Sequence, residues 1–491
     1  MGGSSLDSDR LTCTAVHPKV RDHLRRMTFP IHPNGHANGY VVPVNTDMDD
    51  AEIRPLLGNR HTSHSLRPEH SFWRHFFLNP TSSPGTDDPN PFVRWPARVW
   101  NVTKVTLFSS WINFLLVFVP LGIVAGEKEW GAGWVFSLNF LAIIPLAAVL
   151  SFATEEIAHP LGETLGGLVN ATFGNAVELI VSIVALRAGE IEVVQASMLG
   201  SILSNLLLVL GMCFVLGGFY NMRGPNGEGI EQSFAQGTAQ TTCSLMALAS
   251  ASMILPAALY GVLDQHEEDH KQASILILSR GTSIILLILY CLYLCFALRT
   301  HKTLFEPEAQ SRQQNGAEEE EHTTVLGPWS AALVLVATTV IISFCADYMV
   351  DSIDALVATG KISKTFIGLI LIPIVGNAAE HVTACVVAVK DKMDLAMGVA
   401  IGSSIQIALL VTPALVMLGW AIGQPMTLHF ETFETVAFAL SVLVVTYTVQ
   451  DGKSNYLEGA MLLGLYIIIA LAFWASSTDA FPKTSLPLPW N

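Results

Sequence analysis

Long apolar segments constrain the fold of this chain most strongly, because about 20 apolar residues suffice to cross the hydrocarbon core of a bilayer. Hydrophobic residues make up 51% of the 491 residues and charged residues only 14%. The mean hydropathy is +0.46. These values exclude an ordinary soluble protein, and a segment that crosses lipid must be a helix that satisfies its own backbone. We therefore predict an all-α polytopic membrane protein with eleven transmembrane helices, at 104–126, 133–157, 163–187, 192–219, 239–262, 273–298, 329–350, 364–389, 394–420, 432–449 and 457–476.

The polar segments divide the chain. Residues 1–100 are rich in His, Pro, Asn and Arg without periodicity, which predicts a largely disordered tail with a short surface helix near Ser71–Leu78. The arginines of this tail favour a cytosolic N-terminus. The longest internal loop, 301–328, carries Glu318, Glu319, Glu320 and Glu321, either as a solvated face or as a cytosolic regulatory element. The resulting organisation is 1–100 (tail), 101–300 (first span and five helices), 301–328 (acidic loop), 329–478 (five helices) and 479–491 (short tail).

A five-residue phrase occurs once in each half of the chain. Gly-Asn-Ala-Val-Glu at 174–178 matches Gly-Asn-Ala-Ala-Glu at 376–380, and in each half a Gly-Ser pair follows the glutamate by 22 residues. Ser151–Glu155 likewise matches Ser343–Asp347. Because each half has an odd number of spans, the second half enters the membrane from the opposite side. This 1+5+5 plan with two inverted repeats is typical of secondary transporters, whose site lies at the repeat interface.

The two glutamates are the strongest candidates for a binding site. A carboxylate near the middle of a membrane helix costs about 2.5–3.5 kcal/mol on insertion scales, so a bound cation is the simplest explanation for two of them. The asparagine three residues earlier lies on the same helix face. This hard-oxygen set suits Ca²⁺ better than zinc or copper, and no cofactor is indicated. The candidate metal-site residues are Glu178, Glu380, Asn175, Asn377, Gly174, Gly376, Ser201, Ser204, Ser403 and Gln406.

The charge of the two glutamates indicates which ion is exchanged for the metal. Two carboxylates in a low-dielectric cavity raise each other's pKa, so protons are the available replacement when the metal leaves. Mutually exclusive binding of metal and protons is the condition for antiport. Glu155, Asp347 and His381 are candidates for the proton pathway.

Other interpretations stay open at this point. The glutamates could be structural, the asparagines could join helices, and the serines and Gln406 could simply allow close packing. His381 could be a packing residue, and Glu155 and Asp347 could be solvated at the interface. The exchanger could carry Mn²⁺ or use Na⁺. An intramembrane enzyme would need a nucleophile–base pair or an HExxH motif, and neither is visible. The net charge of −15 argues against nucleic acid. The lipid bilayer is the expected surrounding, and the sequence leaves the oligomeric state open.

The repeated phrases resemble the two signature repeats of the cation/proton exchanger (CAX) family of the Ca²⁺/cation antiporter superfamily. The resemblance rests on 174–183 and 376–381 and covers about residues 100–478. It implies a fungal- or plant-type vacuolar exchanger that loads Ca²⁺ into an acidic compartment in exchange for H⁺, and thus serves calcium homeostasis. It also implies that Glu178 and Glu380 are the central ligands and that Glu155 and His381 are linked to protons. The acidic run at 318–321 would be the family's cytosolic acidic helix.

Overall fold

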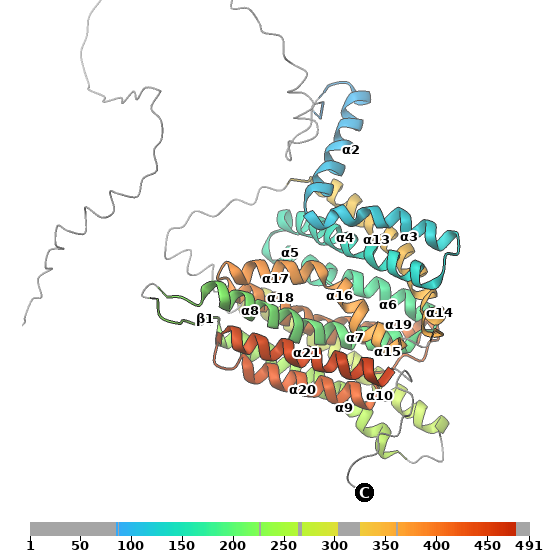
Figure 1. Ribbon diagram of the computed structural model, residues 1–491, viewed down its shortest axis with the longest axis vertical. Coiled ribbons are helices and arrows are strands. Elements are labelled where there is room, and N and C mark those ends of the chain that lie inside the picture. Colours follow the sequence, from blue (N-terminus) through green and yellow to red (C-terminus); the bar gives the residue numbers. More distant parts are fainter. Residues whose placement is uncertain are drawn as a thin grey trace, which may run out of the picture. The chain divides into compact units, whose positions relative to one another are not determined.

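The long apolar segments of the sequence are helices in the computed structural model (Figure 1). The structure describes residues 85–86, 88–224, 227–263, 268–302, 325–359 and 362–477. Contacts divide the chain into residues 1–66 and 67–491, and all described residues belong to the second unit. Three predicted features lie outside the described residues: the surface helix near Ser71–Leu78, the run Glu318–Glu321 and the tail 479–491.

The helices of the first half follow one another with short connections. They are α2 (Pro91–Phe108), η3 (Trp111–Val117), α3 (Phe118–Glu127), α4 (Ala132–Ala158), η4 (His159–Leu161), α5 (Gly162–Phe173), α6 (Ala176–Ala188), α7 (Ile191–Leu203), η5 (Ser204–Val209), α8 (Leu210–Asn221), α9 (Gln236–Val262), α10 (Glu268–Cys295) and η6 (Phe296–Thr300). The segments η3 and η4 are 3₁₀-helices, whereas η5 and η6 are π-helical.

The second half has a similar series of helices. They are α13 (Pro328–Asp351), α14 (Ile353–Val357), α15 (Lys364–Phe366), η7 (Ile367–Leu371), α16 (Ile372–Gly376), α17 (Ala378–Val389), α18 (Met393–Gln406), η8 (Ile407–Val411), α19 (Thr412–Ile422), α20 (Thr432–Thr448) and α21 (Tyr456–Ser477). Both η7 and η8 are π-helical. One short antiparallel pair, β1 (Gln232–Ser233) with β2 (Lys453–Ser454), ties the loop after α8 to the loop before α21.

Seven helices of the described part are long and apolar enough to cross a membrane, or up to nine if each of two bent pairs is one span. Each of the eleven predicted segments coincides with a helix or with consecutive helices. The count by length stays below eleven because α20 has only 17 residues and because α5 and α6, with 12 and 13 residues, are separate helices. The chain is therefore a mostly helical polytopic membrane protein.

The start of the first span differs from the prediction. The sequence predicts a disordered tail up to residue 100 and a span at 104–126, whereas helix α2 already begins at Pro91. The Asn90 side chain caps it by accepting the Phe92 N–H at 3.1 Å. Ser110 is extended, and the chain bends by 110° there before η3 and α3 continue. A capping asparagine followed by proline is a strong helix start, which the polar composition of the tail obscures.

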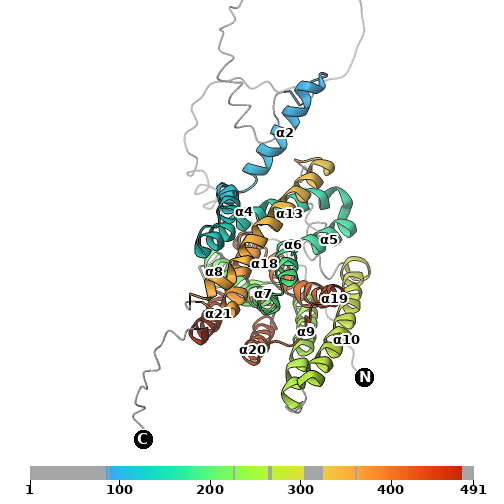
Figure 2. The same cartoon turned by 90° about the vertical axis from the view of Figure 1, so that its right-hand side faces the viewer.

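The two halves are interleaved rather than side by side. Helices α7–η5–α8 and α18–η8–α19 are among the most buried spans, whereas α9, α10 and α21 keep much of their surface outward. Figure 1 shows α16 near α7 and α17 beside α8, and Figure 2 shows α18 next to α7; each of these pairs is in contact. Glycine allows the closest approach, because a Cβ on Gly200 would clash with the carbonyl of Leu369. Residues that lie far apart in the sequence thus meet in one interior.

Candidate cation site

Two helix breaks position the two repeated phrases. Helix α5 ends at Phe173 and α6 begins at Ala176, while α16 ends at Gly376 and α17 begins at Ala378. Asn175 and Asn377 precede the new helices with non-helical backbone angles (φ −101°, ψ 30° and φ −87°, ψ 5°). The second break bends the chain by 56°. Broken helices at membrane depth are tolerated where they line a cavity, and they are a common way to build ion sites.

Each break puts a glutamate in the first turn of the following helix. Glu178 lies in the first turn of α6 and Glu380 in the first turn of α17. A Cβ on Gly376 would lie 2.6 Å from Glu178 Oε1, so the Glu178 carboxylate rests against the break that carries Glu380. The two charges act on each other. Glycine at 376 is therefore required by the space that the opposite glutamate occupies.

Ser403 connects the two phrases through hydrogen bonds. Its Oγ donates to Asn175 Oδ1 at 2.8 Å and accepts from Asn205 Nδ2 at 3.0 Å. The same Oγ is 3.4 Å from Glu380 Oε1. One hydroxyl has a single proton, so the shorter contact to Asn175 is the favoured one in this arrangement.

Several oxygens in this interior are buried without a hydrogen-bond partner among the described residues. They are Glu380 Oε2, Asn377 Oδ1, Asn205 Oδ1 and Ser201 Oγ. A buried polar atom without a partner costs roughly 1–3 kcal/mol, so a cluster of such acceptors is not expected unless something binds them. Within the described part, no group of three or more His, Cys, Asp or Glu side chains could hold a metal. A cation here would bind the two carboxylates together with amide and hydroxyl oxygens.

A cavity of about 580 Å³ reaches this cluster from one end of the helices. Its inner part is lined by Glu380, Ser403 and Gln406, and its outer part by Glu155, Asp394 and the ends of α4 and α10. Gly174 also lines it, and a Cβ there would lie 3.9 Å from Gln406 Oε1. On the other side of the glutamates, α7 packs closely against η7 and α16. The cavity therefore approaches the cluster from the end where α17 and α18 meet, opposite to the contact of α7 with η7 and α16.

The structure places the remaining candidate residues as follows. Ser204 Oγ and His381 Nε2 are 3.3 Å apart, directly beside the cluster. Glu155 lies at the cavity wall near the end of α4. Asp347 is exposed near the end of α13, where the charges of Asp351 and Arg187 act on it. It does not line the cavity that Glu155 lines.

The sequence interpretation missed Asn205. This residue is fully buried on η5, and besides its bond to Ser403 its amide lies within reach of the Glu380 carboxylate. It directly follows the patch at 200–204, so a polar side chain in the middle of a predicted span was the available signal. The π-helices η5 and η8 follow the two Gly-Ser patches at matching places. Such π-bulges occur frequently at functional sites.

Broken helices around a buried, oxygen-rich cluster in a polytopic helical protein define the class of secondary transporters. The family model of the sodium/calcium exchanger protein matches residues 131–299 and 330–475. The chain is 50% identical over 377 residues to the vacuolar calcium ion transporter of Schizosaccharomyces pombe, covering 77% of this chain and 88% of that protein. It is 43% identical over 379 residues to vacuolar cation/proton exchanger 2 of Arabidopsis thaliana, covering 77% and 83%.

A solved structure agrees with these relatives. The crystal structure of the Ca²⁺/H⁺ antiporter protein YfkE is 34% identical with a TM-score of 0.61, covering 74% of this chain and 98% of that one. The chain therefore belongs to the sodium/calcium exchanger protein family.

Proposed function

We propose that this protein is a secondary active antiporter that moves Ca²⁺ out of the cytosol into an acidic compartment in exchange for H⁺. The observation that carries the proposal is the set of buried oxygens that have no hydrogen-bond partner among the described residues, next to the glutamates of the two repeated phrases. Relatives named as a vacuolar calcium ion transporter, a vacuolar cation/proton exchanger and a Ca²⁺/H⁺ antiporter support it. Ca²⁺ is the transported substrate, not a resident cofactor.

Competition for one pocket couples the two ions. Ca²⁺ takes six to eight oxygen ligands in a flexible geometry, which Glu178, Glu380 and the neighbouring amides and hydroxyls can supply. When Ca²⁺ leaves, two like charges remain in a low-dielectric site, and protons neutralise them. Either one divalent cation or two protons balance the pair, so the two ions exclude each other.

The proton gradient is large enough to drive this exchange. A thousandfold Ca²⁺ gradient costs about 4 kcal/mol. Each proton that returns down about two pH units releases roughly 2.7 kcal/mol. Two or three protons per Ca²⁺ are therefore sufficient when the membrane potential is left aside.

The proposed architecture has eleven spans in a 1+5+5 order with two inverted repeats. In this scheme α5 with α6, and α15 to α17, each form one broken span, and α20 is a short span. The N-terminus faces the cytosol, and the protein resides in the vacuolar membrane. The cavity at the ends of α4 and α10 then opens to the cytosol, where Ca²⁺ is captured.

The proton route uses residues beside the cluster. His381 adjoins Ser204 and follows Glu380 directly, so it can pass a proton between the carboxylates and the surrounding hydroxyls. Glu155 at the cavity wall is placed to exchange protons with the cytosolic side. Asp347, its counterpart in the repeat, serves the other side of the membrane.

Exchange of another cation is the alternative. Mn²⁺ would use the same oxygens, and Na⁺-coupled Ca²⁺ exchange would need sodium as the driving ion. Uptake driven by a sodium gradient and unaffected by a protonophore would favour the second alternative. An intramembrane enzyme fits the site less well, because the cluster offers ligands rather than an activated nucleophile.

The test is Ca²⁺ uptake by reconstituted protein in vesicles with an imposed pH gradient. Wild-type protein should take up Ca²⁺, and a protonophore should abolish the uptake. Glu178→Gln and Glu380→Gln should each lose it by more than a hundredfold, whereas Glu127→Gln, at the exposed end of α3, should keep it. Uptake that persists in both site variants would contradict the proposed ligands.

A further inference from the structure

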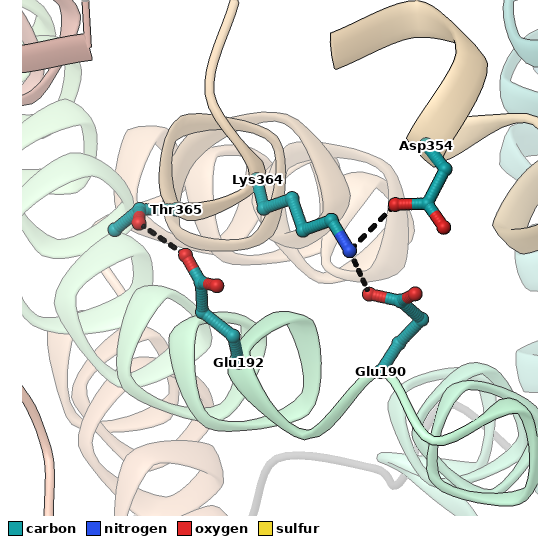
Figure 3. A network of polar contacts seen from close by, with 5 residues as sticks. All are labelled: Glu190, Glu192, Asp354, Lys364 and Thr365. Carbon is teal, nitrogen blue, oxygen red and sulfur yellow. Dashed lines mark hydrogen bonds and ion pairs between the residues drawn. The ribbon is translucent and has the colours of Figure 1, made fainter. Parts of the chain in front are cut away.

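A group of ion pairs lies at the end of the helices that is opposite to the cavity. Lys364, the first residue of α15, places its Nζ 2.7 Å from Glu190 Oε2 and 2.6 Å from Asp354 Oδ1 (Figure 3). The next residue, Thr365, donates to Glu192 Oε1 at 3.0 Å. Glu190 directly precedes α7, and Asp354 lies on α14. We call these five residues the Lys364 network.

The network and the cavity lie at opposite ends of one broken helix. The helix series α15 to α17 starts at Lys364, passes Glu380, and ends at Val389. The cavity is lined by Thr383 and Val387, which come after the glutamate. The network therefore lies on the membrane side opposite to the cavity.

The tightly packed contact between α7 and η7, here called the seam, lies between the network and the cluster. A Cβ on Gly368 of η7 would lie 2.7 Å from the Ala196 Cβ and 3.3 Å from the Ser197 N. One turn deeper, Gly200 leaves no space for a Cβ against the carbonyl of Leu369. This close packing leaves no space for an ion between α7 and η7, so a path along this contact requires the two helices to separate.

The Lys364 network is suited to hold this seam reversibly. Lys364 and Glu190 are partly exposed, with 26% and 17% of their side-chain surface accessible, and Asp354 is 69% accessible. Partly exposed ion pairs contribute modestly to stability, so they can break and form repeatedly. Without the lysine, the carboxylates of Glu190 and Asp354 would lie close together without a positive charge between them and would repel.

We propose that Lys364 is the gating residue of the side opposite to the cavity. Its pair with Glu190 keeps α7 against α15 and η7 while the cavity is open, and its pair with Asp354 ties α15 to α14. The Glu190 pair breaks when the site turns to the other compartment. This inference rests on the proposed antiport, because only an alternating site needs two gates.

The experiment measures opening of the seam directly. Ser197→Cys introduces a thiol at the seam, where the native hydroxyl bonds only within its own helix, to the Val194 carbonyl. The full-length protein is treated with a hydrophilic maleimide, and modification of this cysteine is quantified by peptide mass spectrometry. Lys364→Gln should raise the modification rate about tenfold or more, and Glu190→Gln should do the same. The two substitutions together should add little to either alone.

Two controls make the result specific. Arg187→Gln removes a positive charge at the exposed end of α6, on the same side, and should leave the rate unchanged. Lys364→Arg keeps a positive charge between Glu190 and Asp354 and should retain the protection. A wild-type modification rate in both Lys364→Gln and Glu190→Gln, or a rate in Lys364→Arg as high as in Lys364→Gln, would overturn the gate. The readout needs no transport, so failure of Ca²⁺ uptake with an intact gating response would count against the proposed function alone.

Discussion

Ser403 Oγ donates a hydrogen bond to Asn175 Oδ1 at 2.8 Å, although 228 residues separate them in the chain. Asn175 belongs to the first Gly-Asn-Ala-x-Glu phrase, and Ser403 to the Gly-Ser patch that follows the second. The bond therefore joins the two halves of the protein at the cation cluster. It orients the Asn175 amide. The same Oγ accepts from Asn205, so Ser403 also orients the Asn205 amide next to Glu380.

Replacing this serine should weaken Ca²⁺ binding. Ser403→Ala leaves Asn175 Oδ1 and Asn205 Nδ2 without their partner, and a lost buried hydrogen bond of roughly 1–3 kcal/mol corresponds to about a tenfold rise in the KM for Ca²⁺. The measurement is Ca²⁺-dependent uptake in vesicles at a constant pH gradient. Ser404→Ala is the matched control, because this buried neighbour bonds only to the Ala400 carbonyl of its own helix. Equal KM values for the two variants would contradict the bridging role.

A methyl group at the second helix break should displace the first glutamate. In Gly376→Ala the new Cβ would approach Glu178 Oε1 to 2.6 Å, well inside normal contact, so the carboxylate must move. We expect Ca²⁺ uptake to fall by at least tenfold, since a misplaced ligand loses most of its attraction for the ion. Gly464→Ala, where a Cβ meets no atom within 4 Å, should transport normally. Normal uptake by Gly376→Ala would show that Glu178 is free to occupy another position.

The two Gly-Ser patches should respond differently to the same substitution. Gly200 touches the Leu369 carbonyl, so Gly200→Ala must push α7 away from η7, and overpacking of this kind costs about 1–3 kcal/mol. Gly402 has open space at its Cβ position, and alanine favours the helix there. Thermal unfolding of the purified proteins should show a lower midpoint for Gly200→Ala and an unchanged or higher one for Gly402→Ala. Equal midpoints would disprove the asymmetry between the patches.

His429 should make the protein less stable in acid. It lies in the loop between α19 and α20 and packs against the Tyr260 ring in a tilted arrangement, and Lys271 Nζ lies 3.6 Å from the centre of the same ring. Burial and the Lys271 charge lower the pKa of His429 below its usual value of 6.5. The unfolded chain therefore binds more protons than the folded one as the pH falls below about 6.5, and folding stability decreases.

The contribution of His429 is visible in how much the thermal midpoint changes with pH. Between pH 7 and pH 5, the thermal midpoint of His429→Gln should fall less than that of the wild type. The exposed His159, the first residue of η4, provides the control, since His159→Gln should retain the wild-type change. A wild-type change in His429→Gln would mean that the ring is charged in the folded protein as well.

Much of the fold follows from local sequence signals. Apolar runs predict the helices because the bilayer leaves no other way to satisfy the backbone, and all eleven runs coincide with helices. The resemblance of the repeated phrases correctly predicted the exchanger family. The breaks at Asn175 and Asn377 fall within the phrases that the sequence singled out.

Other features depend on contacts between distant segments. The sequence shows a Gly-Ser patch in each half, yet only the packing reveals that Gly200 is crowded and Gly402 is not. Asn205 looked like any polar residue in a span until its bond to Ser403 placed it in the cluster. Lys364 and Glu190 carry no motif, and their pairing follows from the way α15 approaches the start of α7.

The sequence by itself determined that the chain is a helical membrane protein and that a five-residue phrase occurs in both halves. It also placed a glutamate within an apolar segment of each half, where a carboxylate needs a partner. These properties depend on hydrophobicity and on spacing along a helix, which are local. The tertiary structure decided which oxygens surround those glutamates, which side is open, and which ion pairs lie across the closed side. Such relationships arise only when the halves interleave, because hydrogen bonds and ion pairs act over a few ångströms in space and not along the chain.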